Sequence, residues 1–352
     1  MATRTISAAG GNWNSNGTWD EGAVPTAADD VVARGDGTSG NVTIAANAVC
    51  RSANFTNYVG TLTRNSGISW TIGDGTAGAG NVALTFVAGM TWTDNAPTTA
   101  VTFASSSATQ QTITSGGKTI NRLAFTGAGS WVHTDAAASA ANTGSITLSA
   151  GTWNTGNQAI STGQIISLGT TARVMTLGSS TVTLSNAGAV FTTGGSNLTI
   201  NAGTSTLVVS DTSATQKTIT TPLTLNNLTV SPGGSGVMAI NGGPTFNVFT
   251  ATGPKTVGFD TTATTTATQW NFNGYGGNGV TLGRSNATNP TATISQAAGA
   301  VSATCCTIGR IVATGGARFT NRNGTDNGNN TGWKFLQGIL SGIDSELLTG
   351  AD

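Results

Sequence analysis

Charged residues are scarce in this chain, and the two signs balance. Only 8% of its 352 residues are charged, with 14 Lys and Arg against 14 Asp and Glu, whereas about 25% is ordinary for a globular protein. Binding to nucleic acid or to an anionic membrane relies on an excess of basic residues. We therefore expect neither as a partner. A net charge of zero favours association between copies.

Histidine and glutamate are almost absent. His133 is the only histidine, and Glu21 and Glu346 are the only glutamates. A Ser-His-Asp or Cys-His site would have to use His133, which we interpret instead as an ordinary surface or turn residue. No group of His, Cys, Asp or Glu has the spacing of metal ligands. The sequence thus predicts no catalytic residue, no metal, no cofactor and no enzymatic activity.

Paired carboxylates are the one enzymatic alternative, because enzymes that cleave polysaccharides use two acids on either side of the scissile bond. The candidate acids are Asp20 with Glu21, Asp29 with Asp30, and Asp135. Both pairs lie in a predicted cap, and beyond Asp135 the next two acids are Asp211 and Asp260. A groove halfway along the chain is therefore poorly supplied with acids.

Disulfides, export signals and long apolar runs are also missing. The cysteines are Cys50, Cys305 and Cys306, an odd number without a disulfide or metal spacing, and we interpret them as small buried hydrophobes. The opening MATRTISAAGG has no apolar core of a signal peptide. No run approaches the roughly 18 apolar residues of a membrane helix. We expect a protein that is made and assembled in the cytoplasm.

Short alternating runs of Thr, Val and Ile make up most of the chain, and Gly, Asn, Asp and Ser separate them. β-Branched residues suit half-buried strands, and the separating residues form turns. Glycine alone accounts for 50 positions. The pattern predicts an all-β protein of many short strands.

Internal repeats organise the chain. Residues 107–114 read SATQQTIT and residues 213–220 read SATQKTIT, which indicates two diverged copies 106 residues apart. Apolar markers at Leu148, Leu168, Leu184 and Ile200 recur every 16 to 20 residues. One coil of a parallel β-helix uses about this many residues. We therefore predict a β-solenoid, with tandem β-sandwiches or jelly rolls as the alternative.

Three regions of the chain differ in amino-acid composition. Residues 1–95 are expected to form a cap and the first coils, residues 96–333 the duplicated body, and residues 334–352 an amphipathic tail. The tail is the only helical candidate, because its apolar residues recur at intervals of four. We predict that it either docks on a partner or drives trimerisation, or else caps the open end of the stack as a helix. Its attachment candidates are Phe335, Leu336, Ile339, Leu340, Ile343 and Leu347.

The opening segment GGNWNSNGTWDEGAVPTAADDVV contains the cap candidates Trp13, Trp19, Asp29 and Asp30. We expect NSNG to turn the chain between the tryptophans, whose area covers the end of the first coil. One of the two aspartates can then accept backbone N–H bonds at the cap. The segment resembles the start of β-solenoid modules in phage virion proteins and bacterial surface proteins.

Later segments extend this resemblance. LTINAGTSTLVV and LTLNNLTV are similar to Thr/Asn-rich solenoids of phage structural proteins, and GGARFTNRNGTDNGNNTGWKF resembles the close of such modules. The resemblance implies a structural family of mixed function and carries over no catalytic residue. The missing export signal and the modest length then favour a virion protein, a non-enzymatic fibre or capsid decoration on head or tail. Its partners would be other virion proteins and, in a homotrimer, its own copies. The alternative is a tailspike or adhesin that binds host glycans through clustered Trp and acids.

Overall fold

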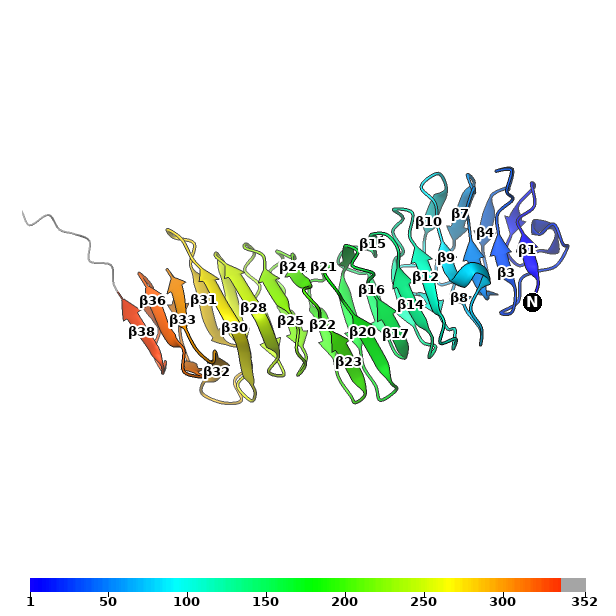
Figure 1. The fold of residues 1–352 in the computed structure, drawn as a ribbon. Coiled ribbons are helices and arrows are strands. Elements are labelled where there is room, and N and C mark those ends of the chain that lie inside the picture. The colour runs from blue at the N-terminus through cyan, green and yellow to red at the C-terminus, as the bar shows by residue number, and fades with distance from the viewer. Residues whose placement is uncertain (337–352) are drawn as a thin grey trace, which may run out of the picture.

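The computed structural model describes residues 1–336 and shows an elongated stack of short strands (Figure 1). Every strand ladder among these residues is parallel, and strands pair with their counterparts in neighbouring coils. The predicted β-solenoid is therefore confirmed. The alternative of sandwiches or jelly rolls is wrong, because those architectures are built from antiparallel ladders. The N-terminus and the last described strand, β38 (Trp333–Leu336), lie at opposite ends of the rod (Figure 1).

Three faces are built in a fixed order along the chain. The first face is a sheet of 9 strands and the third a sheet of 13, whereas the second holds a sheet of 4 followed by one of 12. Turns join the faces, and the described residues also form the 3-10 helices η1 (Asn16–Thr18) and η2 (Ala79–Asn81).

The strands of the first face are β1 (Thr3–Thr5), β3 (Asp30–Val32), β6 (Ser52–Asn54), β9 (Val82–Thr85), β12 (Gln110–Thr114), β14 (Ser130–His133), β17 (Gly151–Asn154), β20 (Arg173–Thr176) and β23 (Leu198–Asn201). The strands of the third face are β5 (Ala48–Cys50), β8 (Trp70–Ile72), β11 (Val101–Phe103), β13 (Arg122–Phe125), β16 (Ser145–Leu148), β19 (Gln164–Ser167), β22 (Ala189–Thr193), β25 (Lys217–Thr220), β27 (Met238–Asn241), β29 (Lys255–Phe259), β31 (Val280–Arg284), β34 (Thr307–Ile308) and β37 (Thr325–Asp326).

The second face begins with β2 (Gly11–Asn12), β4 (Val42–Ile44), β7 (Thr61–Arg64) and β10 (Thr91–Asp94). It continues with β15 (Ala137–Ala138), β18 (Ile160–Thr162), β21 (Thr181–Leu184), β24 (Thr206–Val209), β26 (Asn227–Val230), β28 (Thr245–Thr252), β30 (Thr264–Asn273), β33 (Ala300–Thr304), β36 (Arg318–Arg322) and β38 (Trp333–Leu336). Two further strands belong to this sheet. β32 (Ala292–Ser295) pairs with the first residues of β30, and β35 (Ile311–Thr314) pairs with β32.

Alternation of side chains along each strand builds the core. In β24 and β26 every second residue is buried. Leu207, Leu228 and Phe249 are register partners in successive coils, so they stack in one inward column and are at most 1% exposed. One cluster of buried apolar side chains extends from Ile6 to Phe319. A single coil could not bury such residues alone, so the stack itself makes the core.

The predicted coil length was wrong in detail. Register partners lie 19 residues apart at Ile146 and Ile165 but 25 apart at Leu184 and Val209. The interval of 16 between Leu184 and Ile200 joins two different faces, because these residues belong to β21 and β23. The marker Leu168 is 52% exposed and points away from the core.

The 106-residue repeat does not mark two equivalent halves of the stack. Its first copy forms β12 of the first face, whereas its second forms β25 of the third. The repeat thus describes one strand with its preceding turn, and an inward residue occupies the equivalent position in both copies. That residue is the buried Gln111 in one copy and the buried Lys217 in the other.

The predicted tail begins too early. Residues 334–336 continue the last strand, β38, so Phe335 and Leu336 are strand residues rather than helical ones. The other attachment candidates, Ile339, Leu340, Ile343 and Leu347, lie outside the described residues.

Candidate functional site

The N-terminal end of the rod is closed by the two predicted cap tryptophans. Trp13 is 0% and Trp19 2% exposed, and η1 turns the chain between them. Their rings meet edge to face with centroids 5.0 Å apart, and the Trp19 indole N–H donates to the Trp13 carbonyl at 2.9 Å. Trp13 also packs on Trp70 of the third face. This covers apolar surface that an open first coil would expose.

Both cap aspartates are engaged by hydrogen bonds. Asp29 accepts the backbone N–H groups of Ala2 and Thr26 at 3.2 and 3.0 Å, and Arg4 donates to it at 3.2 Å. Burial alone would raise the pKa of Asp29, but these hydrogen bonds outweigh burial and hold the pKa below its usual range. Asp30 binds the Arg51 guanidinium instead. Both carboxylates therefore hold the cap together.

The opposite end of the described stack is less covered. Trp333 and Phe335 point inward from β38, but each is only half-buried. Trp333 packs edge to face on Phe319 of the preceding coil, with ring centroids 5.2 Å apart. Among the described residues no strand pairs with the outer edge of β38. The two ends of the rod are thus chemically different.

The remaining candidate acids do not converge. Asp20 pairs with Arg34 at 2.7 Å, and Glu21 accepts the Thr5 N–H at 2.8 Å. Asp135 lies several coils away and accepts backbone N–H groups of the turn that follows β12. Each carboxylate holds a turn, so no two of these groups face a common cleft as glycoside cleavage requires.

The interpretation of His133 as a surface or turn residue was wrong. Its side chain points into the lumen from β14 and is 1% exposed. Neither ring nitrogen has a hydrogen-bond partner, and Trp153 packs against the ring edge to face. Burial lowers the pKa of His133 to about 4, although Asp135 partly opposes the effect. The imidazole is therefore neutral inside the fold.

We expect this histidine to make the protein less stable in mild acid. The unfolded imidazole binds a proton near pH 6.5, whereas the folded one binds it only near pH 4. Stability is therefore lost as the pH falls from about 6.5 to 4, and linkage gives a loss of about 2 kcal/mol at pH 5 relative to pH 8. Urea unfolding of His133→Phe over this range should show no such slope. An unchanged slope in the variant would contradict this assignment.

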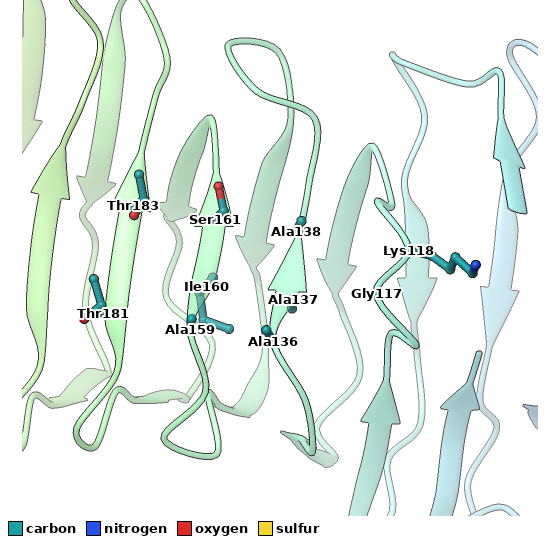
Figure 2. Close-up of a pocket in the computed structure, with 10 residues that line it drawn as sticks. All are labelled: Gly117, Lys118, Ala136, Ala137, Ala138, Ala159, Ile160, Ser161, Thr181 and Thr183. Carbon is teal, nitrogen blue, oxygen red and sulfur yellow. The ribbon is translucent and has the colours of Figure 1, made fainter. Parts of the chain in front are cut away.

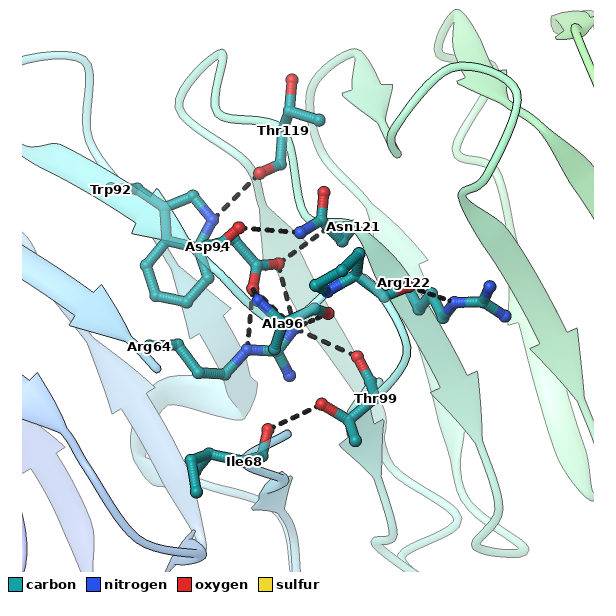
Figure 3. A network of polar contacts seen from close by, with 10 residues as sticks. Arg64, Ile68, Trp92, Asp94, Ala96, Thr99, Thr119, Asn121 and Arg122 are labelled. Carbon is teal, nitrogen blue, oxygen red and sulfur yellow. Dashed lines mark hydrogen bonds and ion pairs between the residues drawn. The ribbon is translucent and has the colours of Figure 1, made fainter. Parts of the chain in front are cut away.

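A buried ion pair lies where the second face is interrupted (Figure 3). Arg64 at the end of β7 binds Asp94 at the end of β10 through two bonds of 2.9 Å, and both side chains are at most 4% exposed. Asp94 also accepts the backbone N–H of Asn121, whose side chain donates to the Asp94 carbonyl. In the next coil Thr119 takes the place of a strand, and the Trp92 indole donates to its carbonyl. The network thus bridges the gap between the two sheets of this face.

A pocket of about 280 Å³ lies beyond this interruption (Figure 2). Its wall consists of small residues, including Ala138, Ala159, Ser161 and Thr183. Lys118 points away from them and donates to the Ala88 carbonyl at 2.9 Å. The pocket therefore offers methyl and hydroxyl groups rather than acids or aromatic rings.

The tryptophans and two of the three cysteines are withdrawn from solvent. All eight tryptophans are buried or half-buried, so none forms an exposed platform for a sugar ring. Cys50 and Cys306 are buried free thiols, as predicted, while Cys305 is half-exposed. Within residues 1–336 no three His, Cys, Asp or Glu side chains gather as metal ligands would. No helix of this part is long and apolar enough to cross a membrane.

The first face has an open edge that the sequence analysis missed. Its sheet ends at β23, and the inward residues Leu198 and Ile200 of this strand are only half-buried. The residue that could have predicted this open edge is Pro222. It lies in the segment of the next coil that follows β23 on this face, and proline has no backbone N–H to donate to a strand ladder. Small pockets lie at the two ends of this edge, one beside Leu198 and one beside Ala202.

Comparison with known proteins found no matching family model, no similar curated protein and no similar solved structure.

Proposed function

We propose that this chain is a non-enzymatic structural protein of the bacteriophage virion, displayed outside the head or tail as a fibre or decoration. The observation that carries the proposal is the rod itself, with one core along its length and chemically different ends. A stack of parallel coils supplies length and rigidity at low charge. The resemblance of the opening, body and closing segments to phage solenoids supports the assignment to a phage particle.

The difference between the ends supports a direction of assembly. Trp13 and Trp19 bury the N-terminal end, whereas half-buried Trp333 and Phe335 form the last described rung. Exposed apolar surface favours contact with another chain. We therefore propose that copies associate through their C-terminal regions, in a homotrimer that is assembled in the host cytoplasm and carried on the particle.

Mass spectrometry of particles purified from the phage that encodes the chain tests this function. We expect the protein to co-sediment with the particles, at hundreds of copies for a capsid decoration or at a few to dozens for a fibre. Its absence from washed particles would refute the proposal. Glycan cleavage by the purified chain would refute the non-enzymatic part.

A further inference from the structure

Charge is distributed unevenly along the rod. Residues 1–95 hold four basic and seven acidic residues, whereas residues 280–336 hold five basic residues and a single acid, Asp326. Each of the four arginines in residues 1–95 forms an ion pair. None of the five cations in residues 280–336 forms one with another described residue. These cations are Arg284, Arg310, Arg318, Arg322 and Lys334.

Two of these cations share a pocket on the third face. β31 and the following strand β34 pair in register, with Thr281 opposite Thr307. Three residues further along each chain segment, Arg284 and Arg310 therefore lie side by side, and both line one pocket of about 200 Å³. Apart from the buried Leu282, the other lining residues are small or polar, namely Thr281, Gly283, Thr307, Gly309 and Asn327.

One turn orients both guanidinium groups. Nη1 of Arg284 donates to the carbonyl of Asn289 at 3.0 Å, and Nη1 of Arg310 lies 3.5 Å from the carbonyl of Pro290. The two carbonyls belong to neighbouring residues, so both guanidinium groups are held at the same turn. A guanidinium has five N–H donors. Neither side chain has another hydrogen bond to a described residue, so most of these donors stay free.

The floor of the pocket is bare backbone between free polar groups. Gly283 and Gly309 carry no side chain there, and a Cβ added at Gly309 would lie only 3.1 Å from the Cβ of Asn327. The side chains of Thr281, Thr307 and Asn327 form no hydrogen bond with a described residue. Hydroxyl and amide groups thus flank the two arginines without partners of their own.

The single acid of these coils does not compensate the arginines. Asp326 precedes Asn327 but does not line the pocket. Its Oδ1 accepts the backbone N–H of Gly328 at 2.9 Å and the side-chain amide of Asn330 at 2.6 Å. Two like charges held close together repel each other. An oxyanion between the guanidinium groups would therefore be bound favourably.

The backbone of Arg310 is strained. Its φ is 61°, in the left-handed region that glycine adopts freely and a bulky residue seldom does. Residues held in this way cluster at binding sites. Backbone geometry alone would favour glycine at this position, so the strain is consistent with a role for the side chain.

We propose that this pocket binds an anionic saccharide, with its carboxylate or phosphate between Arg284 and Arg310. Guanidinium forks match the geometry of both oxyanions. The hydroxyl groups of the sugar then meet Thr281, Thr307 and Asn327. A side-chain carboxylate of a protein partner would use only the arginines, whereas a sugar carries hydroxyl groups beside its charge. The inference goes beyond the proposed virion function and does not depend on it.

Isothermal titration calorimetry of the full-length chain with trigalacturonate and with glucose 6-phosphate tests the site. We expect a charged sugar to bind, more weakly as salt is added, and the neutral galactotriose not to bind. The tighter of the two charged sugars identifies carboxylate or phosphate as the recognised group. Failure of both charged sugars to bind, or equally tight binding of a triaspartate peptide or of inorganic phosphate, would overturn the inference.

Matched variants separate the pocket from overall charge. Arg310→Gly should weaken binding at least about tenfold without lowering stability in urea, because glycine relieves the positive φ. Arg284→Lys keeps the charge but loses the fork, so it should also weaken binding. Arg318→Ala removes an equally unpaired, exposed cation from the second face and should leave binding unchanged. Equal losses in Arg310→Gly and Arg318→Ala would overturn the site.

Three acids outside the described residues could compete for the arginines, namely Asp344, Glu346 and Asp352. The triple variant Asp344→Asn, Glu346→Gln and Asp352→Asn removes them. We expect it to bind the charged sugar as the unaltered chain does. Binding to the triple variant alone would assign the pocket to the acids of the chain itself and overturn the inference.

The two proposals fail in different ways. If the chain is absent from particles but binds a charged sugar through Arg310, the virion function fails and the site stands. If the chain is present in particles and no charged sugar binds, the site fails and the virion function stands.

Discussion

Replacing Arg64 by Met should destabilise the protein by about 3–5 kcal/mol, because it leaves Asp94 as an uncompensated buried charge. Arg64 is 0% exposed, and its two bonds to Asp94 are the only ones that join this carboxylate to a cation in the described residues. Asp94 also orders Asn121 across the interrupted second face. Urea unfolding at pH 7 measures the loss.

A double variant is the control for this pair. Arg64→Met combined with Asp94→Leu removes both charges, so it should recover most of the stability lost in the single variant. A loss below about 1 kcal/mol in Arg64→Met would contradict the buried position of the pair, since that value is typical of exposed ion pairs.

Trp153→Ala should have an effect of similar size, about 3–5 kcal/mol, because it opens a cavity in the lumen. Trp153 is 0% exposed and is the register partner of Trp131 and Met175 in the adjoining coils. Its ring also stacks on Phe125, with centroids 6.1 Å apart. Few other side chains of the rod fill as much of the lumen.

The outward neighbour on the same strand provides the control. Thr152→Ala should change stability by no more than about 0.5 kcal/mol. Because contacts in a solenoid join neighbouring coils, amide exchange in Trp153→Ala should rise first in β14, β17 and β20 and later at the ends of the rod. Equal effects of Trp153→Ala and Thr152→Ala would contradict the inward column.

The fold class followed from the sequence because alternation along strands is local. In β24, Leu207 and Val209 face the core and Thr206 does not, because successive side chains of a strand point to opposite sides. Coil length did not follow, because turns between faces differ in length and similar strands recur on all three faces. The strands of Gln111 and Lys217 share a sequence pattern but lie on different faces.

Individual sites were harder to predict than the fold, because they depend on which coils become neighbours. His133 lies at the end of β14 next to Thr134 and Asp135, yet its position opposite Ile113 turns it into the lumen. Arg64 and Asp94 are 30 residues apart and meet only because β7 and β10 are adjacent. The open edge of β23 likewise arises from the coil that follows it, where Pro222 interrupts pairing.

Distances between spin labels along the third face test the central claim, a rod of parallel coils in register. Thr71, Thr102, Ala124, Thr147, Ile166, Thr192 and Thr220 form one outward column of register partners. Labels at Thr71 and Thr192 should lie about 24 Å apart, and labels at Thr71 and Thr220 about 29 Å apart, because each coil adds about 4.8 Å. Distances that do not grow by one strand spacing per coil would contradict the parallel stack.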